Sequence, residues 1–210
     1  MPTKDIIYLA DRKNAPYGTK TEDEILFLAK NNIGILSNLG CEAILIACCS
    51  ASTVYPRLTE GEREISLPII SPSARLAAEG GRKITVIATS HTARSGAFRR
   101  EIARFSNASV TELAEQELVT LVEKGNRDGH LSPECMIYLR SMAERIRASE
   151  ADSLILGCTH FSHLEREIGR LMPGVRIISP ARVGADVLYN KIKDKRTENG
   201  RNIYLAETKG

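Results

Sequence analysis

The sequence predicts an α/β protein of two lobes with mainly parallel sheets and a ligand cleft between the lobes. Short apolar runs alternate with segments of helical periodicity, a pattern typical of right-handed βαβ units. The adjacent glycines Gly80 and Gly81 separate two such series. We therefore expect a first lobe over residues 1–78, rejoined by 182–210, and a second lobe over residues 79–181.

The expected elements follow one another in order along the chain. Thr21 and Glu24 form a capping box that starts the first helix, and Gly40 ends it. Strands are expected at residues 5–10, 43–47, 67–70, 84–88, 175–178 and 203–206, and a further strand is expected to begin at 154. Further helices are expected from about 52, at 73–78, 95–105, 113–124, 132–149 and 164–171, and from 181.

Composition and charge narrow the classes of partner. The chain has 210 residues, of which 42% are hydrophobic and 26% charged, as in ordinary globular proteins. A net charge of +3 without a basic cluster beside aromatic residues argues against nucleic acid. No apolar run approaches the ~18 residues of a membrane span, and the N-terminus leads into a strand instead of a signal peptide. A cytoplasmic location is therefore expected.

Five cysteines make an odd count without the spacing of a disulfide scaffold, so all five are expected as free thiols. Cys41 and Cys135 fall in segments of helical pattern and are expected to be buried packing residues. Cys48, Cys49 and Cys158 instead follow apolar runs that predict buried strands. Because ligands bind beyond the carboxyl ends of parallel strands, Cys48 and Cys158 are candidates for one cleft.

Each candidate cysteine is followed by hydroxyl side chains, and His160 lies two positions after Cys158. The amides at a helix N-terminus are expected to lower the thiol pKa and favour the thiolate. Three kinds of chemistry are then open. A metal site is disfavoured because no CxxC or HxxxH spacing occurs. A Cys–His hydrolase would leave Cys48 unused, whereas a two-base proton transfer that inverts a stereocentre uses both thiols.

Several smaller features allow both a structural and a functional interpretation. The turn at Tyr17 and Gly18 could present backbone amides to a carboxylate, and Thr92 could cap a helix or bind an anion. Glu123, on a predicted helix, could orient His160 or be solvated. Of the remaining histidines, His163 is expected to be peripheral, and surface positions are expected for two others, His91 and His130.

Four motifs occur in a fixed order along the chain: Asp11 with PYGTK at 16–20, ACCSAS at 47–52, Thr89-x-x-Thr92-x-x-Ser95-Gly96, and LILGCTHF at 154–161. By these motifs the chain resembles the cofactor-independent aspartate/glutamate racemase superfamily, and most closely the bacterial glutamate racemases. The resemblance covers residues from about 5 to about 188.

The resemblance implies two flavodoxin-like lobes, a small acidic amino acid buried between them, no cofactor, no metal, and a homodimer as a candidate assembly. Cys48 and Cys158 would be the two bases, His160 would assist Cys158, and Glu123 would back that histidine. The substrate's carboxylates and ammonium would be held by Tyr17, Gly18, Cys49, Ser50, Thr92 and Thr159. The product, D-glutamate, would serve peptidoglycan synthesis and thereby cell shape.

Two departures from the family accompany this resemblance. Family members open with a strand that ends in Asp-Ser, which has no counterpart before Met1, so an uncovered strand edge is expected in the first lobe. Cys49 also stands where an asparagine usually follows the first catalytic cysteine. A glutamate racemase is the first expectation; a silent relative that binds an acidic amino acid or a partner, and an aspartate racemase, are the alternatives. Asp11 is the carboxylate nearest to the position of the expected aspartate.

Overall fold

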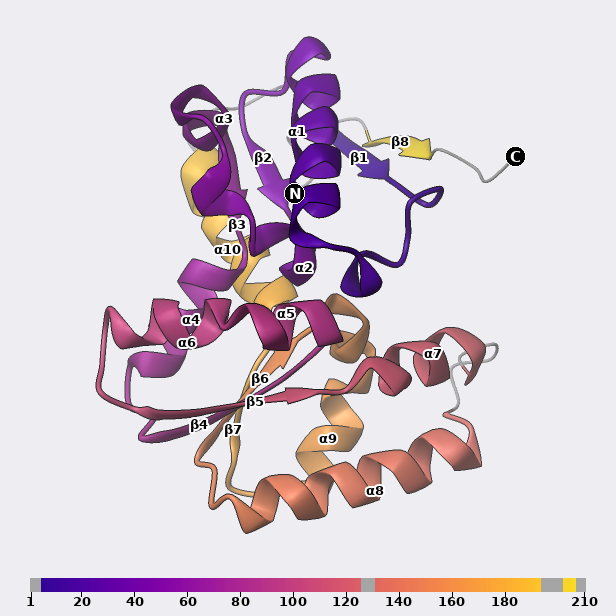
Figure 1. Cartoon of the computed structure of the whole chain (residues 1–210), viewed down its shortest axis with the longest axis vertical. Coiled ribbons are helices and arrows are strands. Elements are labelled where there is room, and N and C mark those ends of the chain that lie inside the picture. The colour runs from indigo at the N-terminus through magenta and orange to yellow at the C-terminus, as the bar shows by residue number, and fades with distance from the viewer. Residues whose placement is uncertain (1–4, 126–130, 194–201, 207–210) are drawn as a thin grey trace.

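The computed structural model describes residues 5–125, 131–193 and 202–206 and confirms the two-lobed α/β architecture (Figure 1). The first lobe contains β1 (Ile6–Ala10), α1 (Glu22–Asn38), β2 (Ile44–Ile46), α2 (Cys49–Ser52), α3 (Glu60–Ile65), β3 (Ser66–Pro68), α10 (Pro180–Ile192) and β8 (Asn202–Ala206). The second lobe contains β4 (Lys83–Ala88), α5 (Ser90–Ser95), α6 (Ala97–Ala103), β5 (Ser109–Ala114), α7 (Gln116–Gly125), α8 (Pro133–Ala148), β6 (Ser153–Gly157), α9 (Glu165–Leu171) and β7 (Arg176–Ile178). Between them lies α4 (Ile70–Ala78).

The second lobe is built on a four-stranded parallel sheet in the order β5-β4-β6-β7. Alternate residues of a strand face opposite sides of a sheet, and β6 is apolar on both. Leu154 and Leu156 pack in the core with α7, α8 and α9, whereas Ile155 packs in the core with α4 and α6. Helices therefore cover both faces of the sheet. This packing holds the carboxyl end of β6, and the Cys158 that follows it, in one position.

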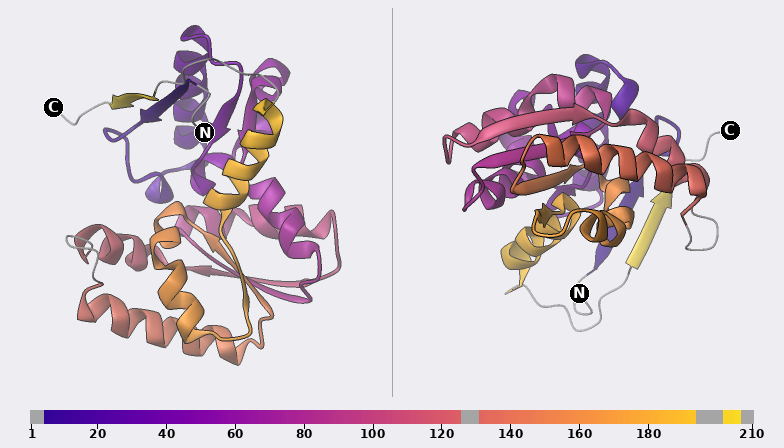
Figure 2. Two further views of the ribbon diagram at one scale, coloured as in Figure 1. Left: turned by 180° about the vertical axis from the view of Figure 1, so that it is seen from behind. Right: turned by 90° about the horizontal axis from the view of Figure 1, so that it is seen from below.

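The first lobe is less continuous. β1 pairs in parallel with β8, and β2 pairs in parallel with β3, and the described residues form no ladder between these two pairs (Figure 2). Its apolar clusters are smaller than those of the second lobe. The capping box of Thr21 and Glu24 is confirmed at the start of α1.

Two elements connect the lobes. α4 packs on α6 and β6 of the second lobe and also on α10. α10 leaves the second lobe after β7 and runs along the first lobe, where it contacts β3 (Figure 2). The expected lobe limits, 1–78 with 182–210 and 79–181, stay a prediction; α4, which was expected in the first lobe, packs mainly on α6, β6 and β7 of the second lobe.

Several expected elements differ from the structure. The helix expected from about residue 52 instead ends there, as α2. The helix expected from Leu113 begins at Gln116, because residues 109–114 form the edge strand β5, whose half-exposed faces lack the apolar run of a buried strand. The strand expected at 67–70 ends at Pro68, which has no N–H for a ladder, and α4 begins two residues later. The helix expected at 95–105 begins at Ala97, after Gly96 with a φ of +62°, and the residues before Gly96 form the separate helix α5 in place of the expected polar turn.

Predictions for isolated residues were partly wrong. Cys41 follows the end of α1 and is half-buried outside any helix, whereas Cys135 is buried in α8 as predicted. His163 is exposed, as predicted. His91 is only 8% exposed, because residues of the first lobe cover it. His130 lies outside the described residues.

Candidate active site

A cavity of about 1320 Å³ lies between the lobes, at the carboxyl ends of β1, β2 and β6. Cys48 and Cys158, which follow β2 and β6, both line it. The two thiols are close enough for charge on Cys48 to raise the pKa of Cys158. The cavity continues along β1 and β2, so it is larger than a small amino acid requires.

Cys48 precedes the first turn of α2 in extended conformation (φ −112°, ψ 127°). The helix start directs donors toward its sulfur, namely the backbone amides of Ser50 and Ala51 and the Ser50 hydroxyl. Its neighbour Cys49 also lines the cavity, but its side chain is buried in the core formed by α4, α6 and β6. Cys48 is thus the thiol of this pair that is more open to a ligand.

Cys158 is the first of three polar side chains that contact one another in sequence. Its Sγ lies 3.5 Å from Nδ1 of His160, and Nε2 of His160 lies 3.1 Å from Oε1 of Glu123 on α7. The imidazole is 39% exposed and the carboxylate 58% exposed, so the far end of the chain reaches solvent. An Nε2–H that donates to Glu123 leaves Nδ1 as an acceptor toward the Cys158 thiol.

The thiol pKa values run against the expectation from the sequence. Burial raises the pKa of Cys158 to about 12, and the backbone donors of His160 and Phe161 offset this only in part. Burial likewise raises the pKa of Cys48 despite the donors from Ser50 and Ala51. The expected lowering of the pKa is therefore wrong for this structure, because desolvation outweighs the amides of short helical turns.

Three hydroxyl groups join the lobes beside the cysteines. Ser50 Oγ lies 2.9 Å from Oγ1 of Thr89 and 3.1 Å from Oγ1 of Thr92, and the two threonine oxygens are 3.0 Å apart. Ser50 and Thr89 line the cavity, whereas Thr92 is fully buried and is not part of its lining. Thr92 therefore contacts the site through its two neighbours.

The loop after β1 forms a second polar cluster. Its centre is the Asp11 carboxylate. Oδ2 accepts a hydrogen bond from the Tyr17 hydroxyl (2.6 Å) and lies 3.5 Å from Asn32 Nδ2. Oδ1 accepts hydrogen bonds from the side chain (2.8 Å) and the backbone N–H (3.3 Å) of Asn14. Burial raises the pKa of Asp11, but these donors outweigh it and lower the net value. The carboxylate is saturated by its own loop and helix α1, and it holds the Tyr17 ring at the cavity wall.

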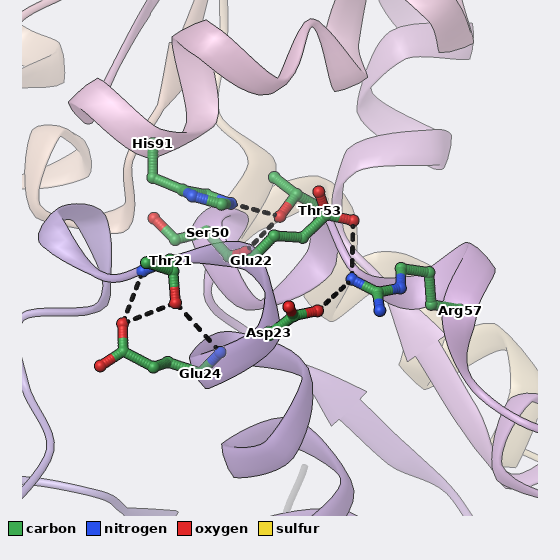
Figure 3. A network of polar contacts seen from close by, with 8 residues as sticks. All are labelled: Thr21, Glu22, Asp23, Glu24, Ser50, Thr53, Arg57 and His91. Carbon is green, nitrogen blue, oxygen red and sulfur yellow. Dashed lines mark hydrogen bonds and ion pairs between the residues drawn. The ribbon is translucent and has the colours of Figure 1, made fainter.

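Close contacts between the lobes explain the glycine after Tyr17. A Cβ on Gly18 would lie 2.6 Å from Cβ of Thr89 and 2.8 Å from Oε1 of Gln116, so only glycine fits here without a shift. On the same interface His91 Nε2 lies 2.9 Å from Thr53 Oγ1 (Figure 3). Because Thr53 donates its own proton to the Ser50 carbonyl, His91 must be the donor in this pair.

Most of the site residues predicted from the sequence line the cavity. The cavity lining includes nine of them: Tyr17, Gly18, Cys48, Cys49, Ser50, Glu123, Cys158, Thr159 and His160. Sequence reasoning assigned no site role to other polar residues of the lining, notably Asn32, Thr89 and Gln116. Thr89 follows a strand as the cysteines do, and that position could have marked it. Asn32 and Gln116 carry no such signature.

Two further expectations concern metals and membranes. Within the described ranges, no group of three or more His, Cys, Asp or Glu side chains is arranged to hold a metal ion. Nor does any helix in that part of the chain have the length and apolar character needed to cross a membrane.

Known proteins resemble this chain in sequence. The model of the Asp/Glu/Hydantoin racemase family matches residues 2–188. A glutamate racemase of Desulforudis audaxviator is 36% identical over 188 residues, covering 86% of this chain and 67% of that protein. A glutamate racemase of Aquifex aeolicus is 32% identical over 200 residues, covering 92% of this chain and 76% of that protein.

Solved structures agree with the sequence matches. The glutamate racemase of Thermus thermophilus in complex with beta-chloro-D-alanine matches with a TM-score of 0.79 at 26% identity, covering 100% of this chain and 80% of that one. The glutamate racemase of Francisella tularensis in complex with D-glutamate has a TM-score of 0.87 at 24% identity and supports the fold. With the family model spanning most of its length, this chain belongs to the Asp/Glu/Hydantoin racemase family.

Proposed function

We propose that this protein is an amino-acid racemase that interconverts L- and D-glutamate by proton transfer at Cα between two cysteines, without a cofactor. The observation that carries the proposal is the convergence of Cys48 and Cys158, from different lobes, on one cavity. The sequence relatives named glutamate racemases support glutamate as the substrate. A family role in supplying D-glutamate for peptidoglycan follows from the same substrate.

The chemistry needs one base and one acid on opposite faces of Cα. In one direction the Cys158 thiolate takes the Cα proton, so that the C–H bond breaks, an S–H bond forms and an electron pair remains on carbon. The Cys48 thiol then gives its proton to the opposite face, and that pair forms the new C–H bond. The reverse reaction exchanges the two roles, so configuration inverts and no atoms are gained or lost.

His160 provides a place for the Cys158 proton. With Glu123 accepting from Nε2–H, Nδ1 can accept the thiol proton and form a thiolate–imidazolium pair. Since burial disfavours an isolated Cys158 thiolate, this pairing is the local route to the base form. We assign His160 to this proton transfer and Glu123 to orienting and charge-stabilising the imidazole.

Substrate binding is assigned to neutral donors around the thiols. The loop of Tyr17 and Gly18, the Ser50 and Thr159 groups and the backbone beside Cys49 line the cavity. Thr92 supports Ser50 from behind the wall. Donors of this kind stabilise the electron-rich carboxylate side of a carbanion.

Assembly and location complete the proposal. A homodimer is proposed on the family resemblance and is tested by light scattering at several concentrations. The five free cysteines suit a reducing compartment such as the cytoplasm. The lobe limits 1–78 with 182–210, and 79–181, are part of the same proposal.

The test is incubation of each enantiomer with the protein in deuterated water. Inversion should place deuterium at Cα, and Cys48→Ser and Cys158→Ser should each abolish it. Cys41→Ser, which alters a thiol in the lining of the same cavity but at the opposite end of β2 from Cys48, serves as the matched control and should retain activity. If neither glutamate enantiomer exchanges or inverts, glutamate racemisation is excluded; the same assay with aspartate separates the alternative substrate.

A further inference from the structure

An acidic substrate in this cavity must be held chiefly by neutral donors. Among the described lining residues, Arg12 is the sole arginine and there is no lysine, whereas four side chains contribute carboxylates: Asp5, Asp11, Glu42 and Glu123. Carboxylate oxygens need hydrogen-bond donors when they leave water. Hydroxyls, backbone amides and side-chain amides therefore have to supply them.

The described cavity lining contains two side-chain amides, Asn32 and Gln116. Asn32 is already engaged, since its Nδ2 donates to the Tyr17 hydroxyl (3.2 Å) and lies 3.5 Å from Asp11 Oδ2. Its donors serve the loop after β1. Gln116 is the amide left for a ligand.

Gln116 is held in one orientation by the second lobe. Its Oε1 accepts a hydrogen bond from the backbone N–H of Ser90 at 3.2 Å. With the carbonyl side fixed, the Nε2 group faces the other way, and no partner among the described residues hydrogen-bonds to it. Gln116 is only partly buried and lines the cavity. The two N–H bonds of its Nε2 group are therefore open to a ligand there.

The location of Gln116 also fits contact with substrate. Gln116, Val119 and Glu123 all line the cavity, and their i, i+3, i+7 spacing places them on one face of α7. Glu123 is already joined through His160 to Cys158. At the other end of this face, Gln116 touches the position of Gly18 across the lobes. One helix face thus connects the Cys158 chain with the loop that closes the cavity.

We propose that Gln116 is a specificity-determining residue whose Nε2 group donates a hydrogen bond to a carboxylate oxygen of the acidic amino-acid substrate. The identity of that substrate rests on the proposed function. The proposal assigns Gln116 to binding, so its loss should raise KM more than it lowers kcat.

The decisive variant is Gln116→Glu. It keeps the shape and leaves an oxygen to accept from Ser90 N–H, but it replaces the donor with an anionic oxygen that repels a carboxylate. We expect KM for glutamate to rise by at least about tenfold, the loss associated with a hydrogen bond to a charged group. Gln116→Met, which removes the donor without adding charge, should raise KM less than Gln116→Glu.

Thr120→Glu is the matched control, because it adds the same charge to α7 at an exposed residue outside the cavity lining. It should change KM by less than about twofold, as expected for a screened surface charge. Thermal unfolding of all three variants shows whether they are folded. A Gln116→Glu protein that is folded and has the KM of Thr120→Glu overturns the proposal.

Calorimetric titration with D-glutamate separates this proposal from the proposed function. If the wild-type protein binds glutamate without racemising it, the proposed function fails, and the ratio of dissociation constants between wild type and Gln116→Glu alone decides the role of Gln116. A ratio of at least about tenfold supports it, and equal constants refute it. If the wild type neither binds nor racemises glutamate, both proposals fall.

Discussion

Replacing His160 with asparagine removes the imidazole that lies 3.5 Å from Cys158 while keeping a polar side chain of similar reach. Cys158 is 6% exposed, and burial raises its pKa to about 12. His160 is the one described side chain that hydrogen-bonds to this thiol, so the variant removes its direct proton acceptor. We therefore predict that His160→Asn slows the steps in which Cys158 gains or loses a proton.

The magnitude follows from the thiol. At about pH 7.5, forming a thiolate from a group with a pKa of about 12 costs about 6 kcal/mol. A positioned acid–base group contributes about 10²–10⁴ in rate, or about 3–5 kcal/mol, which lies within that cost. We expect kcat/KM to fall by about 10²–10⁴.

The assay measures racemisation from both enantiomers with protium and deuterium at Cα. Since L- and D-glutamate have equal free energies, kcat/KM must fall by the same factor in both directions. The asymmetry appears in isotope effects: the Cα effect rises for the enantiomer deprotonated by Cys158, and the solvent effect rises for the other. His163→Asn, at an exposed position, should leave all values unchanged. A His160→Asn protein with wild-type isotope effects in both directions would refute the reasoning.

Three further predictions concern packing and pH. Gly18→Ala places a Cβ 2.6 Å from Thr89 and should lower kcat/KM at least about tenfold, whereas Gly34→Ala, with open space around it, should not; equal activities would contradict this. Phe161→Ala empties a fully buried site and should lower the free energy of unfolding in urea by about 3–5 kcal/mol; a loss under about 1 kcal/mol would show that the site collapses. Burial lowers the pKa of His91, so the unfolded chain binds its proton more tightly. The contribution of His91 to the free energy of unfolding is therefore complete above about pH 6.5 and falls below it, by at most about 1.4 kcal/mol per pH unit. His91→Gln should remove that component from the pH dependence of unfolding in urea. An unchanged pH dependence would contradict the assignment.

Much of the site was predictable because strand ends are local features of the sequence. An apolar run that stops at Cys48 and another that stops at Cys158 predict two strand ends, and parallel sheets bring such ends to a common crevice. The capping box of Thr21 and Glu24 was equally local and is confirmed. These features depend on neighbours within a few residues.

What could not be predicted depends on residues distant in sequence. The polar turn around His91 suggested a surface, but Thr53 of the other lobe covers it. The thiol pKa values rise because several elements bury Cys48 and Cys158 at once. Gln116 fell within a longer expected helix, because the edge strand β5 carries too few apolar residues to be recognised.

The two halves of the site differ in how protons leave them. Cys158 connects through His160 to Glu123, whose side chain is more than half exposed, so its proton has a route to solvent. The hydrogen bonds that stabilise the Cys48 thiolate come from the backbone amides of Ser50 and Ala51, which cannot accept a proton, and from the Ser50 hydroxyl, which can both donate and accept one. A racemase must restore the starting protonation of both thiols after each inversion. Both thiols must therefore exchange protons between turnovers: Cys158 does so through His160 and Glu123, and Cys48, which is only half-buried, does so directly with the cavity that it lines.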